Sequence, residues 1–232
     1  MTNQVHMMIL CGRMAAVTYK AIRSVRMRIG SDGNLVISAP KGVKKSYLEN
    51  FVREHLDWIE KQEGKVRAVP DRSVFDGAIH RILGEDVVLH IVSAPLNSVT
   101  RMGDHLFIGT KDTDEAYCEA LLENYLKKEA KALFTEIAEE FYPLFAAKGV
   151  KMPAISVRRM TSRWGSCTPS KGTIRFNLYL YEAPMDCVKS VVLHEMTHLL
   201  YADHGKGFYD FLIRHMPDYR ARKKKLEESV KI

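Results

Sequence analysis

The chain has 232 residues, 46% of them apolar, and its 35 Lys and Arg against 28 Asp and Glu give a net charge of +7 at pH 7. This apolar content can build a hydrophobic core without disulfide support, and the absence of any run of 18 apolar residues excludes a predicted membrane span. The four cysteines are widely spaced and form no CxxC pair, which argues against a thiolate zinc site. The N-terminus lacks the basic start of a signal peptide. We therefore expect a cytoplasmic protein with reduced thiols.

The first 110 residues are predicted to form a β-rich module with one helix. Residues 17–39 alternate in polarity on either side of SDGN, which predicts a β-hairpin, and residues 44–62 have apolar positions at helical spacing. A polar connection at residues 64–73 follows, and then RILGEDVVLHIV and HLFIGT again predict strands. No internal repeat is evident. We therefore place one domain at residues 1–110 and a second at 111–232.

The second domain is predicted to contain both helices and strands. Thr113 is a suitable N-cap for a long amphipathic helix that Pro143 ends, and residues 155–160 and 173–181 are predicted strands. A helix starting near Met185 is apolar on almost every side, which indicates that it is buried.

The segment SRWGSCTPSKG between the two strands is rich in Gly, Ser and Pro and is predicted to be a loop. Arg163 and Trp164 at its tip are candidates for substrate contact, although Trp164 could equally fill a hydrophobic gap. Asn177, on the polar face of the strand at 173–181, is a third candidate.

The basic excess could attract polyanions such as nucleic acid. Its densest cluster, RARKKKLEE at residues 220–228, has a helical pattern and ends in glutamates. Without interleaved aromatic residues this cluster favours a solvated helix face, and we expect at most a weak polyanion association through it.

The buried helix carries HEMTH at residues 194–198. Residues at i and i+4 point the same way on a helix, so His194 and His198 can hold one ion between them. Glu195 is rotated off that axis and can reach a water beside the metal, as a general base requires. The spacing therefore predicts a metal site that activates water for hydrolysis.

A third ligand requires the helix to stop, because a continuing helix would turn His204 away from His194. The sequence Ala202-Asp203-His204-Gly205 favours such a bend, and helical spacing resumes after it. We favour His204 as the third ligand over His215, Glu227 and Glu228. Zn²⁺ is the expected metal, although manganese, cobalt or nickel can also bind three imidazoles.

Several segments together resemble the YgjP-like metallopeptidase family. They are SRWGSC, GTIRFNLYL, HEMTH followed by DHGKGF, MPDYRARKKKL and, upstream, RSVRMRI, SAPKGV and FVREHLDWI. The resemblance implies a zincin-like α+β domain related to SprT-type and M48-like peptidases, with His194, His198 and His204 as zinc ligands and Glu195 as catalytic base. Tyr201 stands where metzincins have a glycine, which argues against that branch.

The expected function is zinc-dependent hydrolysis of peptide bonds. A polypeptide substrate could pair with residues 173–181 as an edge strand, and Tyr219, Tyr209, His215 or Arg163 could donate to the oxyanion. The alternatives are a metal-dependent hydrolase of nucleotides or other phosphoanhydrides that uses the same residues, and a non-catalytic module stabilised by metal.

Overall fold

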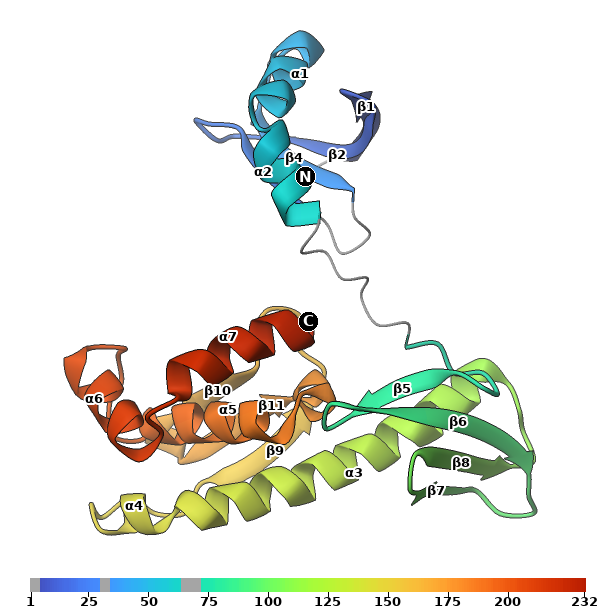
Figure 1. Cartoon of the computed structure of the whole chain (residues 1–232), viewed down its shortest axis with the longest axis vertical. Helices are drawn as coiled ribbons and strands as arrows, with labels where there is room; N and C mark the ends of the chain where they lie inside the picture. The colour runs from blue at the N-terminus through green and yellow to red at the C-terminus, as the bar shows by residue number, and fades with distance from the viewer. Residues whose placement is uncertain (1–4, 30–33, 64–71) are drawn as a thin grey trace. The chain divides into compact units, whose positions relative to one another are not determined.

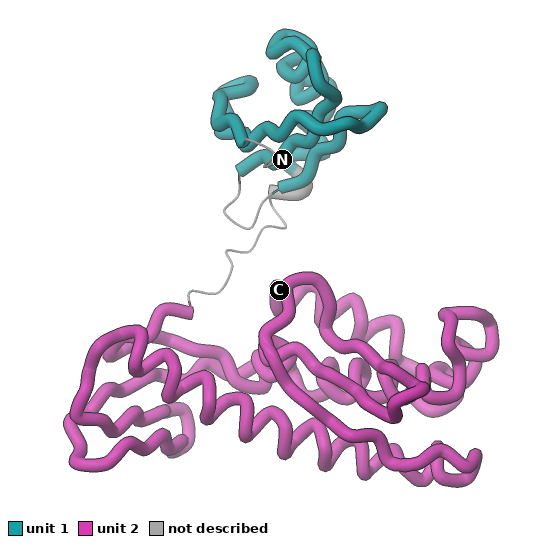
Figure 2. The backbone as a smooth tube through the Cα atoms, turned by 180° about the vertical axis from the view of Figure 1, so that it is seen from behind, with its two compact units in different colours: residues 1–69 teal, residues 70–232 magenta. Residues whose placement is uncertain are grey.

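A computed structural model describes residues 5–29, 34–63 and 72–232. The contacts divide the chain into two compact units, unit 1 (residues 1–69) and unit 2 (residues 70–232), shown in Figure 2. This division differs from the boundary at 110/111 expected from the sequence. Residues 31–33 of the SDGN turn and residues 64–71 of the polar connection lie outside the described residues.

Unit 1 is a four-stranded sheet with two helices on one face. Its described elements are β1 (Val5–Leu10), β2 (Arg13–Lys20), β3 (Arg26–Ile29), β4 (Leu35–Pro40), α1 (Lys45–Glu54) and α2 (Leu56–Glu63). The strand order is β1-β2-β4-β3, so the predicted hairpin is β3 with β4, and β1 and β2 add to it. Alternate strand residues such as Val17 and Ile37 are fully buried against Leu48, Val52 and Ile59 of the helices.

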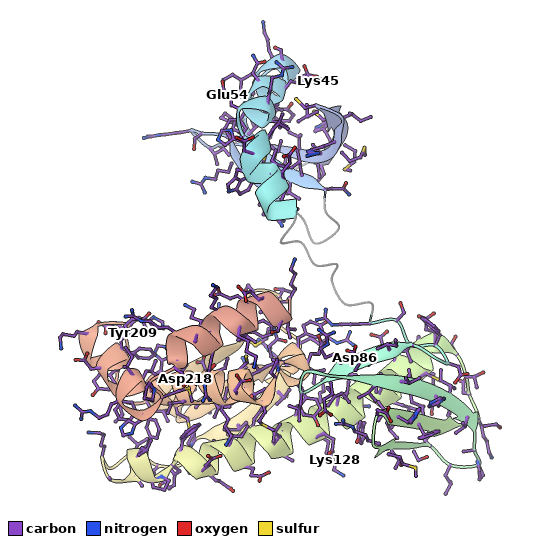
Figure 3. All side chains as sticks on the ribbon, in the orientation of Figure 1. Lys45, Glu54, Asp86, Lys128, Tyr209 and Asp218 are labelled. Atoms are coloured by element: carbon purple, nitrogen blue, oxygen red, sulfur yellow. The ribbon has the colours of Figure 1, made fainter. Side chains whose placement is uncertain are left out.

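Unit 2 begins with a second four-stranded sheet, β5 (Ile79–Ile82), β6 (Glu85–Ser93), β7 (Ser98–Met102) and β8 (His105–Thr110). Figure 3 places Asp86 on β6 of this sheet. The buried faces of β6 and β8 contribute Val87, Leu89, Leu106 and Ile108 to a core that also contains Cys118 and Leu122 of the following helix.

The sheet of unit 2 repeats the topology of the sheet in unit 1, a repeat that the sequence analysis missed. Both have the order 1-2-4-3, with an antiparallel pair at each side and a parallel pair in the centre. Each first hairpin turns through a non-glycine and a glycine that both have positive φ, Cys11-Gly12 in unit 1 and Leu83-Gly84 in unit 2. Two positive φ values are what a two-residue type I′ turn requires.

Helix α3 (Glu115–Phe141) explains why the boundary lies at 69/70. Its first turns pack against β5–β8, and its later residues Ala130, Phe134, Ile137 and Ala138 belong to the core of the second half of unit 2. Figure 1 shows this helix running past β5–β8 and on into the second half of unit 2. A cut at 110/111 would separate a sheet from the helix that covers it. The helix is capped by Asp114, which accepts from the backbone N–H of Tyr117, and not by Thr113.

The second half of unit 2 has a three-stranded sheet of order β10-β11-β9. Its elements are α4 (Pro143–Ala146), β9 (Ala154–Arg158), β10 (Gly165–Thr168), the 3-10 helix η1 (Pro169–Lys171), β11 (Thr173–Asn177) and the 3-10 helix η2 (Leu178–Glu182). The predicted edge strand at 173–181 is wrong in two respects. Its strand ends at Asn177, and β11 lies in the centre of the sheet. The edge strands are β9 and β10, and β10 lies within the predicted loop.

Three helices complete unit 2: α5 (Met185–Thr197), α6 (Lys206–His215) and α7 (Tyr219–Ser229). Helix α5 packs against α3, α6, α7 and β10, so nine of its residues are buried. The expected α+β class is confirmed. Among the described residues, none of the helices combines the length and apolar character needed to cross a bilayer.

Candidate metal centre and active site

The C-terminal part of α5 supplies the first three residues of the site. His194 and Glu195 lie in its last turn, and His198 is its C-cap residue with helical φ and ψ. The buried hydroxyls of Ser190 and Thr197 donate to backbone carbonyls of the same helix, so the buried helix leaves neither of them unsatisfied. The helix therefore holds its two histidines on a rigid, apolar support.

The chain then turns as the sequence predicts, but earlier. The helix ends at Thr197, and backbone bonds from Leu200 and Tyr201 to the Thr197 carbonyl close its last turn. The Asp203 carboxylate accepts from the backbone N–H of Gly205, just before α6 begins. This bend brings His204 back toward the helix, with its ring centroid 5.0 Å from that of His194 and 4.7 Å from that of His198.

The three imidazoles converge on one point. One ring nitrogen from each of His194, His198 and His204 lies within 4.8 Å of the others. The Nδ1 atom of His194 is 2.7 Å from the Tyr219 hydroxyl, and the Nδ1 atom of His198 is 3.1 Å from the Tyr201 carbonyl, which can only accept. The Tyr201 contact assigns a proton to Nδ1 of His198 and leaves its Nε2 as the acceptor, whereas the Tyr219 hydroxyl can donate to or accept from His194.

This donor set fits zinc. Two ligands of a tetrahedral zinc ion with bonds of about 2.05 Å are roughly 3.3 Å apart. The Nε2 atoms of His194 and His204 are 3.2 Å apart. Burial lowers the pKa of His198, and burial together with the charges of His198, His204 and Lys223 lowers the pKa of His194 to about 3. Both rings are thus neutral near pH 7, the form that binds a metal.

Glu195 lies between the helix and the edge strand. It is only 6% exposed, and burial raises its pKa to about 7 against the opposing charge of Arg163. Gly165 of β10 makes this position possible, because a Cβ atom there would lie 2.6 Å from Glu195 Cγ and 2.8 Å from its Cδ. A carboxylate with a pKa near 7 is suited to accept and return a proton at neutral pH.

A cavity of about 710 Å³ opens above these residues. Its walls come from β10 and the loop before it, from α5, from the bend and from α7. The lining includes Arg163, Trp164, Gly165, Ser166, His194, Glu195, His198, His204, Tyr219, Lys223 and Glu227. Trp164 both lines the cavity and packs against the main core, so the two interpretations of this residue are compatible.

Asn177 is not in the lining, and it is fully buried. Its side-chain oxygen accepts from the backbone N–H groups of Met160 and Tyr179, and its nitrogen donates to the carbonyls of Met160 and Arg163. These bonds use the whole amide. The residue therefore fixes the loop that carries Arg163, and we do not propose that it contacts substrate.

The structure also distinguishes among the other candidates for the third metal ligand and for the oxyanion donor. His215 and Glu228 do not line the cavity, and Glu227 lines it without joining the histidine cluster. Of the four oxyanion candidates, Arg163 and Tyr219 line the cavity, whereas Tyr209, labelled on α6 in Figure 3, and His215 do not. Sequence reasoning missed the packing of Gly165 against Glu195 and the contact from Tyr219 to His194, because both join residues that are distant in sequence.

A family described as "YgjP-like, metallopeptidase domain" matches residues 23–229. The chain belongs to the YgjP-like family. The match covers the bend, all three histidines and the whole of α7, and it makes a metal-dependent peptidase the function of the domain. A comparison with curated proteins finds no match.

Proposed function

We propose that this YgjP-like domain is a zincin-like, zinc-dependent peptidase in which His194, His198 and His204 hold the metal and Glu195 is the general base. The observation that supports it best is the convergence of three imidazole nitrogens within 4.8 Å, beside a buried carboxylate and an open cavity. In such a site zinc supplies Lewis-acid activation of water and of the substrate carbonyl.

The residues of the chain supply the remaining steps. The Glu195 carboxylate accepts a proton from the attacking water and then returns it to the nitrogen of the leaving amine. Tyr219 orients the His194 ring from the side opposite its acceptor nitrogen. Arg163 is the better placed oxyanion donor of the two that line the cavity, because the Tyr219 hydroxyl lies behind His194.

The edge strand β10 is the surface on which we place the substrate. It pairs with β11 on one side only, and its first residue packs against Glu195. An extended polypeptide added along its outer side would form main-chain hydrogen bonds and bring a peptide bond to the catalytic carboxylate.

The test compares two substrate classes on the metal-loaded full-length chain: an unfolded polypeptide and a panel of nucleoside triphosphates. We expect cleavage of the polypeptide that chelation abolishes, that zinc restores, and that Glu195→Gln reduces by at least about a hundredfold. Arg163 and Lys223 in the cavity keep a phosphoanhydride hydrolase as the second candidate. Hydrolysis of triphosphates alone, with the same dependence on Glu195, would establish that alternative instead.

A further inference from the structure

The wall that α7 contributes to the cavity carries a cation, Lys223. Three neighbouring cations on the same helix are engaged in ion pairs, in which Arg222 contacts Asp218, Lys224 contacts Glu228 and Lys225 contacts Asp186. Lys223 is exposed, and within the described part of the chain no carboxylate lies within 4.0 Å of its Nζ atom. Its charge is therefore available to a ligand in the cavity.

Lys223 lies one helical turn from Tyr219 on the same wall of the cavity. Tyr219, which contacts His194, marks the end of the helix nearest the metal site. Lys223 is one turn further along, about 6 Å on the helix axis, and Glu227 is two turns further, about 12 Å. The cation is thus nearer to the catalytic residues than the acid that shares this wall.

Arg163 adds a second positive charge to the cavity, from the loop that leads into β10. Both β10 and α7 pack against α5, so the two cations reach the cavity from different elements around the same helix. Apart from Glu195, which is buried, Glu227 is the one carboxylate among the lining residues of the described chain. Arg163 and Lys223 thus outnumber the single exposed carboxylate of this lining, which favours an anionic group on the substrate.

We propose that Lys223 forms a carboxylate-binding subsite, so that the preferred substrates carry an acidic group close to the scissile bond. An extended peptide advances about 3.3 Å per residue and covers the spacing from Tyr219 to Lys223 in about two residues, so we place the acidic group two residues from that bond. This inference rests on the proposed peptidase function and specifies its substrates. The carboxylate can belong to an Asp or Glu side chain or to the C-terminus of the substrate.

Matched peptides test the inference and separate the two sources. One pair differs by Glu against Gln two residues from the cleaved bond, and a second pair by a free C-terminus against an amide. We expect kcat/KM of the metal-loaded full-length chain to be about threefold to tenfold higher for the acid of at least one pair. The preference falls as salt is raised, because the contact is solvent-accessible.

Variants on α7 tie the preference to one side chain. Lys223→Gln reduces the acid-to-amide ratio toward one, and Lys223→Glu inverts it because like charges then repel. Lys224→Gln is the matched control. It removes the same charge from the next residue, which does not line the cavity, and leaves the ratio unchanged.

Equal kcat/KM for acid and amide, or a preference that Lys223→Glu leaves intact, overturns the subsite while metal-dependent cleavage still supports a peptidase. The Glu195→Gln variant provides a readout that needs no cleavage, because fluorescence anisotropy measures its binding of labelled peptides. Tighter binding of the acid that Lys223→Glu abolishes supports the subsite even if no peptide is cleaved. Equal binding of acid and amide counts against it.

Discussion

Gly165 of β10 packs directly against the side chain of Glu195 on α5. An added Cβ atom would lie 2.6 to 2.8 Å from the Cγ, Cδ and Oε1 atoms of Glu195, so this side chain would have to shift. Gly165→Ala should therefore displace the carboxylate and lower kcat/KM for a polypeptide by about tenfold to a hundredfold. Because the histidines are untouched, metal content measured by atomic spectroscopy should stay at the wild-type value. Full activity would show that the position of Glu195 is not critical.

The buried Glu195 also has a cost in stability. Burial raises its pKa from 4.5 to about 7, so the folded state favours the protonated form. In metal-free protein the resulting destabilisation is absent below pH 4.5, grows as pH rises from 4.5 to about 7, and is constant above that. Glu195→Gln should thus raise the free energy of unfolding by about 1 to 3 kcal/mol at pH 8 and by almost nothing at pH 4.

Urea titrations of the chelated wild-type chain and of Glu195→Gln at the two pH values measure this difference. A stabilisation of equal size at pH 4 and pH 8 would mean that ionisation of the carboxylate is not its cause.

The elements of the site differ in how far the sequence could predict them. Helix α5 and the return of His204 follow from local signals, namely apolar spacing and a bend around Asp203 and Gly205. Strand β10 has four residues in a segment rich in Gly, Ser and Pro, and its pairing with β11 leaves no strong local pattern. The sequence therefore predicts which three histidines come together, but misplaces the edge strand beside them.

Helix α7 contacts the histidine cluster through the hydroxyl of Tyr219, which lies 2.7 Å from His194 Nδ1. Outer contacts of this kind orient a ligand and raise its basicity, so Tyr219→Phe should weaken zinc affinity by about tenfold to a hundredfold with little change in the buried ring packing. Competition with a chromophoric chelator measures the affinity. Tyr209→Phe is the control, because its ring lies 6.3 Å from His204 and the described chain gives its hydroxyl no hydrogen bond. An equal loss in both variants would contradict a specific role for Tyr219.

At the scale of the whole chain, two sheets of the same topology belong to different units. The sequence analysis joined them into one module because both are strand-rich and precede the long helix α3. The sheets differ in what they pack on: the first shares a core with α1 and α2, and the second with α3. The polar connection at residues 64–73 contains the boundary, but the sequence pattern does not show which sheet shares a core with α3, because that depends on contacts between distant segments.

The separate cores predict that unit 2 folds without unit 1. Each of the three buried clusters lies within a single unit, and α3 joins the two clusters of unit 2 into one body that contains the entire histidine site. A chain of residues 70–232 is long enough to bury a stable core. It should unfold in one cooperative transition in urea and bind one zinc ion with an affinity within about threefold of the full-length value.

Starting that chain at Pro70 keeps Arg72, which forms a bidentate ion pair with Glu182 and donates to the Lys231 carbonyl. A start after Arg72 should cost stability, because Glu182 would lose its partner at the end of η2, next to the N-terminus of α5. A shortened chain that unfolds gradually or binds no zinc would show that unit 1 is required for the fold of the site. If the shortened chain unfolds cooperatively and binds zinc, unit 1 is not needed for metal binding, and its role would concern the substrate.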